Sequence, residues 1–279
     1  MNKFIVALDG LHFSTSATTY AVELAQSNDA FLTGVFLDDR TFSSYKIYDL
    51  VLKDGVSESK IKHLRQQDTA TRSQSSDFFI ESASNARLNF NVHHDHNVAL
   101  QELIHESIYS DLLIIDEKES LSHYDEKHPS RFIRDVLADA QCPVLVVPSE
   151  YKSIQKIVFL FDGTPSAVFA IKLFSYLLPH FSKLSIDVVS VKSMEEDAHL
   201  PDNTLVKELL KRHYRQVNYF VLKGISETEI IQYFSIANAA SIIVTGAYRR
   251  SDLSRWFKPS IADILIKNFH LPLFVAHSK

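Results

Sequence analysis

Glycine is rare in this 279-residue sequence, which has only six. They are Gly10, Gly34, Gly55, Gly163, Gly224 and Gly246. Glycine-rich loops bind phosphates because their backbone amides can approach the ligand closely and adopt positive φ angles. The sequence contains no Walker A motif, no G-x-G-x-x-G and no G-x-S-x-G. At the level of motifs, the common phosphate loops and the hydrolase nucleophile turn are therefore absent.

Cysteine and long apolar runs are also lacking. The single cysteine, Cys142, excludes an internal disulfide and fits a reducing cytoplasm. The opening MNKFIVALDG reaches a strand pattern within three residues and has no apolar signal-peptide region. No apolar run approaches the roughly 18 to 20 residues of a membrane span. We expect a cytoplasmic protein without membrane contact.

An excess of positive charge is missing as well. The 29 basic and 34 acidic residues give a formal net charge of −5. Such a chain has no general attraction to nucleic acid or to anionic membranes. The 46% apolar content is typical of a folded protein with one large or two ordinary domains. A small molecule or another protein is the expected partner.

What the sequence does contain is a long internal repeat. KFIVALDG (Lys3–Gly10) recurs as KIVFLFDG (Lys156–Gly163), so that Asp9 matches Asp162. Each copy continues with a helix-start signal, Ser14 or Ser16 in the first and Thr164 in the second. Further apolar strands recur in the same order, and their ranges are 30–37 and 184–191, 88–94 and 217–223, 111–116 and 241–246, 143–148 and 272–277.

The alternation of strands and helices predicts the fold. Continuous apolar strands separated by helices indicate parallel sheets covered on both faces. We predict two tandem doubly wound α/β domains of five strands, in the order 3-2-1-4-5, at residues 1–149 and 153–279. The polar linker SEYKS joins them. The first copy is longer because of residues 38–87, which predict a loop and a long polar-faced helix.

The closing strands predict how the domains associate. Strand five of each sheet lies at an edge, and the rows Val144–Val147 and Leu273–Val275 are too apolar to remain unpaired there. We expect the two copies to pair through these strands as an intramolecular pseudo-dimer. Whether this unit forms a homodimer, and with which proteins it interacts, the sequence does not define.

In order, spacing and duplication, these motifs resemble a tandem universal stress protein of the UspA family. The resemblance covers the whole chain and implies an adenine-nucleotide α-hydrolase-like fold. In the nucleotide-binding branch of that family, the loop after strand four reads G-x2-G-x9-G-[ST]. Its glycines admit phosphates to backbone amides, and the aspartate after strand one meets the nucleoside.

Neither copy retains the complete loop. The four motif positions in the second copy are Gly246, Arg249, Pro259 and Ser260. In the first copy they are Asp116, Glu119, Pro129 and Ser130. One glycine of three therefore survives in the second copy and none in the first. The Pro-Ser ending, a helix-start signal, is kept while the phosphate cradle is lost.

Charge separates the two loops. Residues 117–129 carry four carboxylates and two lysines, a net of −2, which repels a triphosphate. Residues 247–259 carry four basic residues and one aspartate, a net of +3, which favours gripping an anion with side chains. A cluster of basic residues in a loop is usually a solvated surface, but if the chain binds a nucleotide or another anion, we expect it in the second domain, at Asp162, Gly246, Arg249, Arg250 and Ser260. The weaker candidates in the first domain are Asp9 and Ser130.

No catalytic or metal-binding set emerges. VHHDHN (Val92–Asn97) places only two metal-ligating side chains on each strand face, so a polar strand end is the favoured interpretation. Asp9 and Asp162 lack a partner base or nucleophile nearby in sequence. Bonding to backbone amides of the following turn explains them at least as well as ligand contact.

Three hypotheses follow from the sequence. The first is a cytoplasmic stress-response protein that acts by binding and interaction and not by catalysis, with nucleotide binding absent or residual. The second is a regulator that binds ATP or another adenine nucleotide in the second domain alone. The third, a nucleotide hydrolase or transferase on the same scaffold, lacks an identifiable catalytic set.

Overall fold

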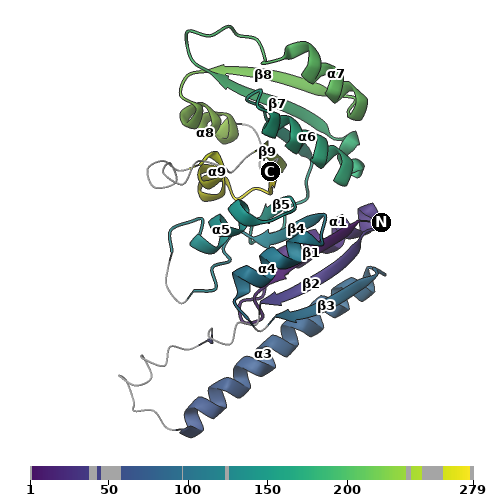
Figure 1. Ribbon diagram of the computed structural model, residues 1–279, viewed down its shortest axis with the longest axis vertical. Coiled ribbons are helices and arrows are strands. Elements are labelled where there is room, and N and C mark those ends of the chain that lie inside the picture. Colours follow the sequence, from purple (N-terminus) through teal and green to yellow (C-terminus); the bar gives the residue numbers. More distant parts are fainter. Residues whose placement is uncertain are drawn as a thin grey trace.

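The computed structural model describes residues 2–37, 43–44, 58–95, 97–122, 126–236, 240–246 and 260–276. In this part of the chain, a single ten-stranded sheet runs through the molecule with helices along it (Figure 1). The strand order is β3-β2-β1-β4-β5-β10-β9-β6-β7-β8. Each half thus has the predicted order 3-2-1-4-5, and the predicted α/β fold class is confirmed.

The first half alternates strands and helices. Its elements are β1 (Lys3–Leu8), α1 (Thr15–Asn28), β2 (Phe31–Leu37), α3 (Glu58–Asn85), β3 (Phe90–Asp95), α4 (Ala99–Ile108), β4 (Leu112–Asp116), α5 (Arg131–Asp139) and β5 (Val144–Val147). All neighbouring strands in this half are parallel. The carboxyl ends of β1 and β4 therefore lie side by side.

The second half repeats the pattern. Its elements are β6 (Lys156–Leu160), α6 (Pro165–Leu177), the 3-10 helix η1 (Pro179–Lys183), β7 (Ser185–Lys192), α7 (Asn203–His213), β8 (Val217–Lys223), α8 (Ser226–Ile236), β9 (Ser241–Gly246), α9 (Ile261–Phe269) and β10 (Leu273–Ala276). These strands are also parallel to one another.

Side chains fix the first helix of each half at the predicted place. The hydroxyl of Ser14 accepts from the Ala17 backbone N–H at 3.1 Å, and that of Thr164 accepts from Ala167 at 3.3 Å. Pro165 occupies the first turn of α6, where its missing N–H has no helical partner to lose. Both strand-turn-helix units thus begin as the sequence predicts.

The core lies in two layers, one on each face of the sheet. One layer packs α1, α3, α6 and α7 against the strands, and the other packs α4, α5, α8 and α9. Each layer contains buried residues of both halves, so neither core ends at the linker. Because helices cover both faces of the sheet, its strands are apolar on both faces.

The two halves meet through their last strands. β10 pairs antiparallel with β5, with Leu273 opposite Val146 and Phe274 opposite Leu145. Phe274 is fully buried, and its ring packs edge-on against Phe174 of α6 at a centroid distance of 5.3 Å. The pairing covers both strand edges and makes one sheet out of two.

Helix α3 forms most of the described part of the first-half insertion. It is a 28-residue helix with few buried side chains, and it extends away from the sheet (Figure 1). Its C-terminal part docks through Phe79, which packs so closely on β2 that a Cβ at Gly34 would lie 2.8 Å from the ring. The helix is confirmed; the rest of the insertion, residues 38–42 and 45–57, lies outside the described residues.

Truncating Phe274 on β10 tests the packing where the two halves meet. We expect Phe274→Ala to lower the free energy of unfolding by about 3–5 kcal/mol, because it empties a dry site beneath the strand that joins the halves. Phe169→Ala on α6, where the ring is exposed, is the matched control and should cost about 0.5 kcal/mol. Urea unfolding followed by circular dichroism measures both, and equal losses would contradict the packing.

Candidate functional site

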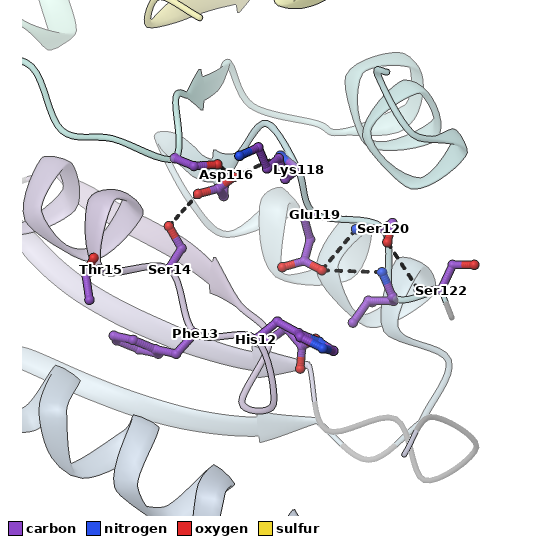
Figure 2. A pocket seen from close by; sticks show the side chains of 12 residues that line it. His12, Phe13, Ser14, Thr15, Asp116, Lys118, Glu119, Ser120 and Ser122 are labelled. Atoms are coloured by element: carbon purple, nitrogen blue, oxygen red, sulfur yellow. Dashed lines mark hydrogen bonds and ion pairs between the residues drawn. The ribbon is translucent and has the colours of Figure 1, made fainter. Parts of the chain in front are cut away.

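A cavity of about 400 Å³ lies in the first half, at the carboxyl ends of β1 and β4 (Figure 2). Its wall is formed by the turn after β1, the start of α1 and the loop after β4. Open parallel sheets bind ligands in this position. We call this cavity the first cleft, and its lining includes Asp9, Phe13, Ser14, Asp116, Glu119 and Leu121.

Asp9 holds the turn after β1. One carboxylate oxygen accepts from the backbone N–H of Leu11 at 2.8 Å, and the other lies 2.8 Å from Nδ1 of His12. The side chain is only 1% exposed. The amide-bonding role expected for Asp9 is therefore present, and the carboxylate also orients an imidazole at the cleft.

Asp116 lies where β4 meets the start of α1. Its carboxylate accepts from the Ser14 hydroxyl at 2.5 Å, the Lys118 backbone N–H at 2.8 Å and the Ser149 hydroxyl at 2.9 Å. The positive end of a helix dipole attracts an anion in such a place. In this protein a carboxylate of the chain lies beside the start of α1 and would repel an incoming phosphate.

Glu119 is the most perturbed carboxyl group of the cleft. Its Oε1 accepts from the backbone N–H groups of Ser120 at 3.1 Å and Leu121 at 3.3 Å. Burial, followed by the charge of Asp9, raises the pKa of Glu119 to about 8 despite these hydrogen bonds. At neutral pH the carboxyl group is therefore mainly protonated, and at higher pH it adds a third negative charge.

Ser130, a candidate for phosphate contact, has another use. Its hydroxyl donates to the backbone carbonyl of Glu119 at 2.5 Å and accepts from the N–H of Ile133 at 3.2 Å. It is buried, and it does not line the first cleft. The hydroxyl ties the loop to the start of α5.

Glu117 connects the loop to the second half. Its carboxylate is buried and lies 2.7 Å from Nδ1 of His270, just after α9. Burial raises the pKa of Glu117, and the hydrogen bond from His270 partly opposes that rise. Glu117 also donates its backbone N–H to Val147 at 2.8 Å, so the loop begins at a fixed point beside the paired strands.

In the second half, the described candidate residues have local structural partners. Asp162 is exposed and accepts from the backbone N–H of Thr164 at 2.9 Å and from its hydroxyl at 2.7 Å. Ser260 forms a reciprocal capping box with Asp263 at the start of α9. Arg249 and Arg250 lie outside the described residues.

Gly246 has a packing role. A Cβ atom there would lie 2.5 Å from the backbone nitrogen of Ala167 and 2.5 Å from the carbonyl carbon of Ser166. The end of β9 therefore approaches the first turn of α6 so closely that only glycine fits without displacement. Close packing alone is sufficient to account for this glycine.

The histidine-rich strand end has partners of its own. His93 lies 2.7 Å from a carboxylate oxygen of Glu106, and the ring of His94 stacks on Phe36 at 5.2 Å. Within the described ranges, no group of three or more His, Cys, Asp or Glu side chains is arranged to hold a metal ion. None of the helices in that part of the chain has the length and apolarity of a membrane span.

Sequence comparison gives local matches. No family model matches the chain. A universal stress protein of Staphylococcus haemolyticus is 39% identical over 74 residues, which are 25% of this chain and 44% of the relative. One from Staphylococcus saprophyticus is 48% identical over 48 residues, 17% and 29% of the two chains. The chain thus matches less than half the length of either relative.

Structural comparison extends over the whole chain. The crystal structure of a universal stress protein from Archaeoglobus fulgidus aligns with 99% of this chain and 98% of its own, at a TM-score of 0.70 and 12% sequence identity. At this identity the likeness concerns the fold. The local sequence matches and the structural match are thus both to universal stress proteins.

The raised pKa of Glu119 makes stability depend on pH. A carboxyl group that keeps its proton in the folded state up to about pH 8, but loses it near pH 4.5 when unfolded, destabilises the fold progressively as pH rises between these values. Glu119→Gln keeps the size and the acceptor but cannot ionise. We expect it to be more stable than the wild type at pH 8.5, by on the order of 1–3 kcal/mol.

That gain should shrink toward pH 5, as urea unfolding at the two pH values would measure. Glu150→Gln, the same change at an exposed position, serves as control and should leave both values unchanged. A constant difference between pH 5 and 8.5 would contradict the burial of Glu119.

Proposed function

We propose that this chain, a member of the UspA universal stress protein family, serves the stress response by binding and interaction and not by catalysis, with nucleotide binding absent or residual. The position of Asp116 carries the proposal. A carboxylate hydrogen-bonded to Ser14 lies in the first cleft beside the start of α1, where it would repel a nucleotide phosphate. The buried cysteine thiol fits action in the cytoplasm.

The pairing of polar groups supports a non-catalytic role. The Ser14 hydroxyl donates to Asp116, whereas His12 is bonded to Asp9. The Ser14 hydroxyl also accepts from the Ala17 backbone N–H and so caps α1, which gives it a structural use. The arrangement suits holding a ligand better than transforming it.

An alternative assigns an adenine nucleotide, such as ATP, to the second half. The exposed carboxylate of Asp162 and the net charge of +3 over residues 247–259 favour it. In that case Asp162 would meet the nucleoside, and Gly246, Ser260, Arg249 and Arg250 would surround the phosphates. Gly246 lends this alternative little weight, because the close approach of α6 already requires glycine there.

Calorimetry separates these functions. Titration of Mg-ATP into protein stripped of co-purified ligand should give no binding heat up to about 1 mM. A dissociation constant of about 1 mM corresponds to a binding free energy of about −4 kcal/mol, so the titration would detect any tighter site. Mass spectrometry of small molecules released on denaturation provides an independent check. Phosphate release that depends on a named residue would establish the hydrolase instead.

A single ATP site lost in Asp162→Ala but kept in Asp9→Ala would overturn the first function in favour of the alternative. The two aspartates hold equivalent turns in the two halves, so each variant is the matched control for the other.

A further inference from the structure

We propose that the first cleft binds a small organic cation, an ammonium or guanidinium group carried on a short apolar stem. The inference rests on the proposed binding function and gives it a ligand class. It concerns the same fold position in which the family resemblance implies a nucleotide, but with the opposite charge.

Several hydrogen-bond donors around the cleft are already bonded to carboxylates of the chain itself. Asp116 accepts hydrogen bonds from Ser14, Lys118 and Ser149, so these three donors at the cleft are already engaged. Asp9 does the same in the turn after β1. A ligand that enters therefore meets carboxyl groups with few remaining donors, which favours a ligand that brings its own N–H groups.

One carboxyl oxygen remains for such a donor. Glu119 is only 8% exposed and points into the cleft (Figure 2). Its Oε1 has two backbone donors, but no residue in the described ranges donates to its Oε2. When Glu119 is ionised, this oxygen is an acceptor at the cleft, and a bound N–H donor would hydrogen-bond to it.

The charges around Glu119 define what the donor should be. Asp9 and Asp116 face it across the cleft, and both raise its pKa. Lys118 and His12 also line the cleft, but Lys118 is exposed and His12 is bonded to Asp9. A positively charged group would relieve the repulsion among the three carboxyl groups, whereas a neutral donor would not.

The remaining walls define the stem. Phe13 and Leu121 line the same cleft, and the Phe13 ring is held edge-on to Phe78 at 5.3 Å. The volume of about 400 Å³ is within the range of small-molecule sites. An aliphatic chain with a cationic end therefore fits better than a bare metal ion, for which the described residues provide no ligand group.

A series of probes tests this directly. We expect 1,5-diaminopentane and agmatine to bind the full chain at pH 8.5 in isothermal titration calorimetry, and 1,5-pentanediol, the neutral isostere, not to bind. Glu119→Gln should weaken the cations about tenfold or more, since it removes a charge-assisted hydrogen bond. Glu150→Gln is the control, because it removes one exposed carboxylate just beyond Ser149 without changing the lining.

The pH profile distinguishes contact from a structural effect. Binding a cation favours ionised Glu119, so the affinity of the wild type should rise between pH 6.5 and 8.5, by up to about tenfold per pH unit if one proton is released. The probes stay charged throughout, because alkyl ammonium and guanidinium groups titrate above about pH 10. Glu119→Gln should flatten the profile.

Three results would each overturn the inference. They are equal binding of the diol and the diamine, no binding of either cation up to about 10 mM, and binding of Mg²⁺ or Ca²⁺ alone with the same sensitivity to Glu119→Gln. The first two use only the wild-type chain, so they do not depend on the folding of a variant. Failure here leaves the proposed function intact, whereas binding of Mg-ATP in the second half, lost in Asp162→Ala, would overturn that function and leave the ligand class of the first cleft untouched.

Discussion

Antiparallel pairing of β5 with β10 is the constraint on which the rest of the structure depends. Each half alone would be an open five-stranded sheet with an apolar row at one edge. Pairing removes both edges, lets the two core layers continue across the junction and brings His270 against Glu117. Because Glu117 is the first residue after β4, the association of the halves also fixes where the loop of the first cleft begins.

The two halves use the first motif position of the same loop differently. In the second half, the backbone of α6 lies so close to β9 that the position must be Gly246. In the first half a side chain fits, and Asp116 uses that room to bond with Ser14 at the start of α1. The first half thus has a carboxylate at the loop position where the second half has glycine.

Local signals made much of the fold predictable. Asp-Gly turns, the caps Ser14 and Thr164, and continuous apolar strands are set by residues close in sequence, and they predicted the elements and their order. The burial of Glu117 and Glu119 was not predictable in this way. A net-charge count for the loop treats both glutamates as solvated. In the fold both are buried, Glu117 beside His270 and Glu119 at the first cleft. One signal was present: exposed Lys118 separates the two buried acids, as an alternating segment would.

The first cleft destabilises the fold because it contains a buried acid. Burying Glu119 near Asp9 and Asp116 opposes folding at neutral and alkaline pH, yet no described cation neutralises the group inside the protein. Lys118 follows Asp116 directly but remains exposed, so the chain does not use its nearest charge for that purpose. Carboxyl acceptors have replaced backbone donors at a position that open α/β sheets use for ligands. That substitution reverses the charge that the same topology can recognise.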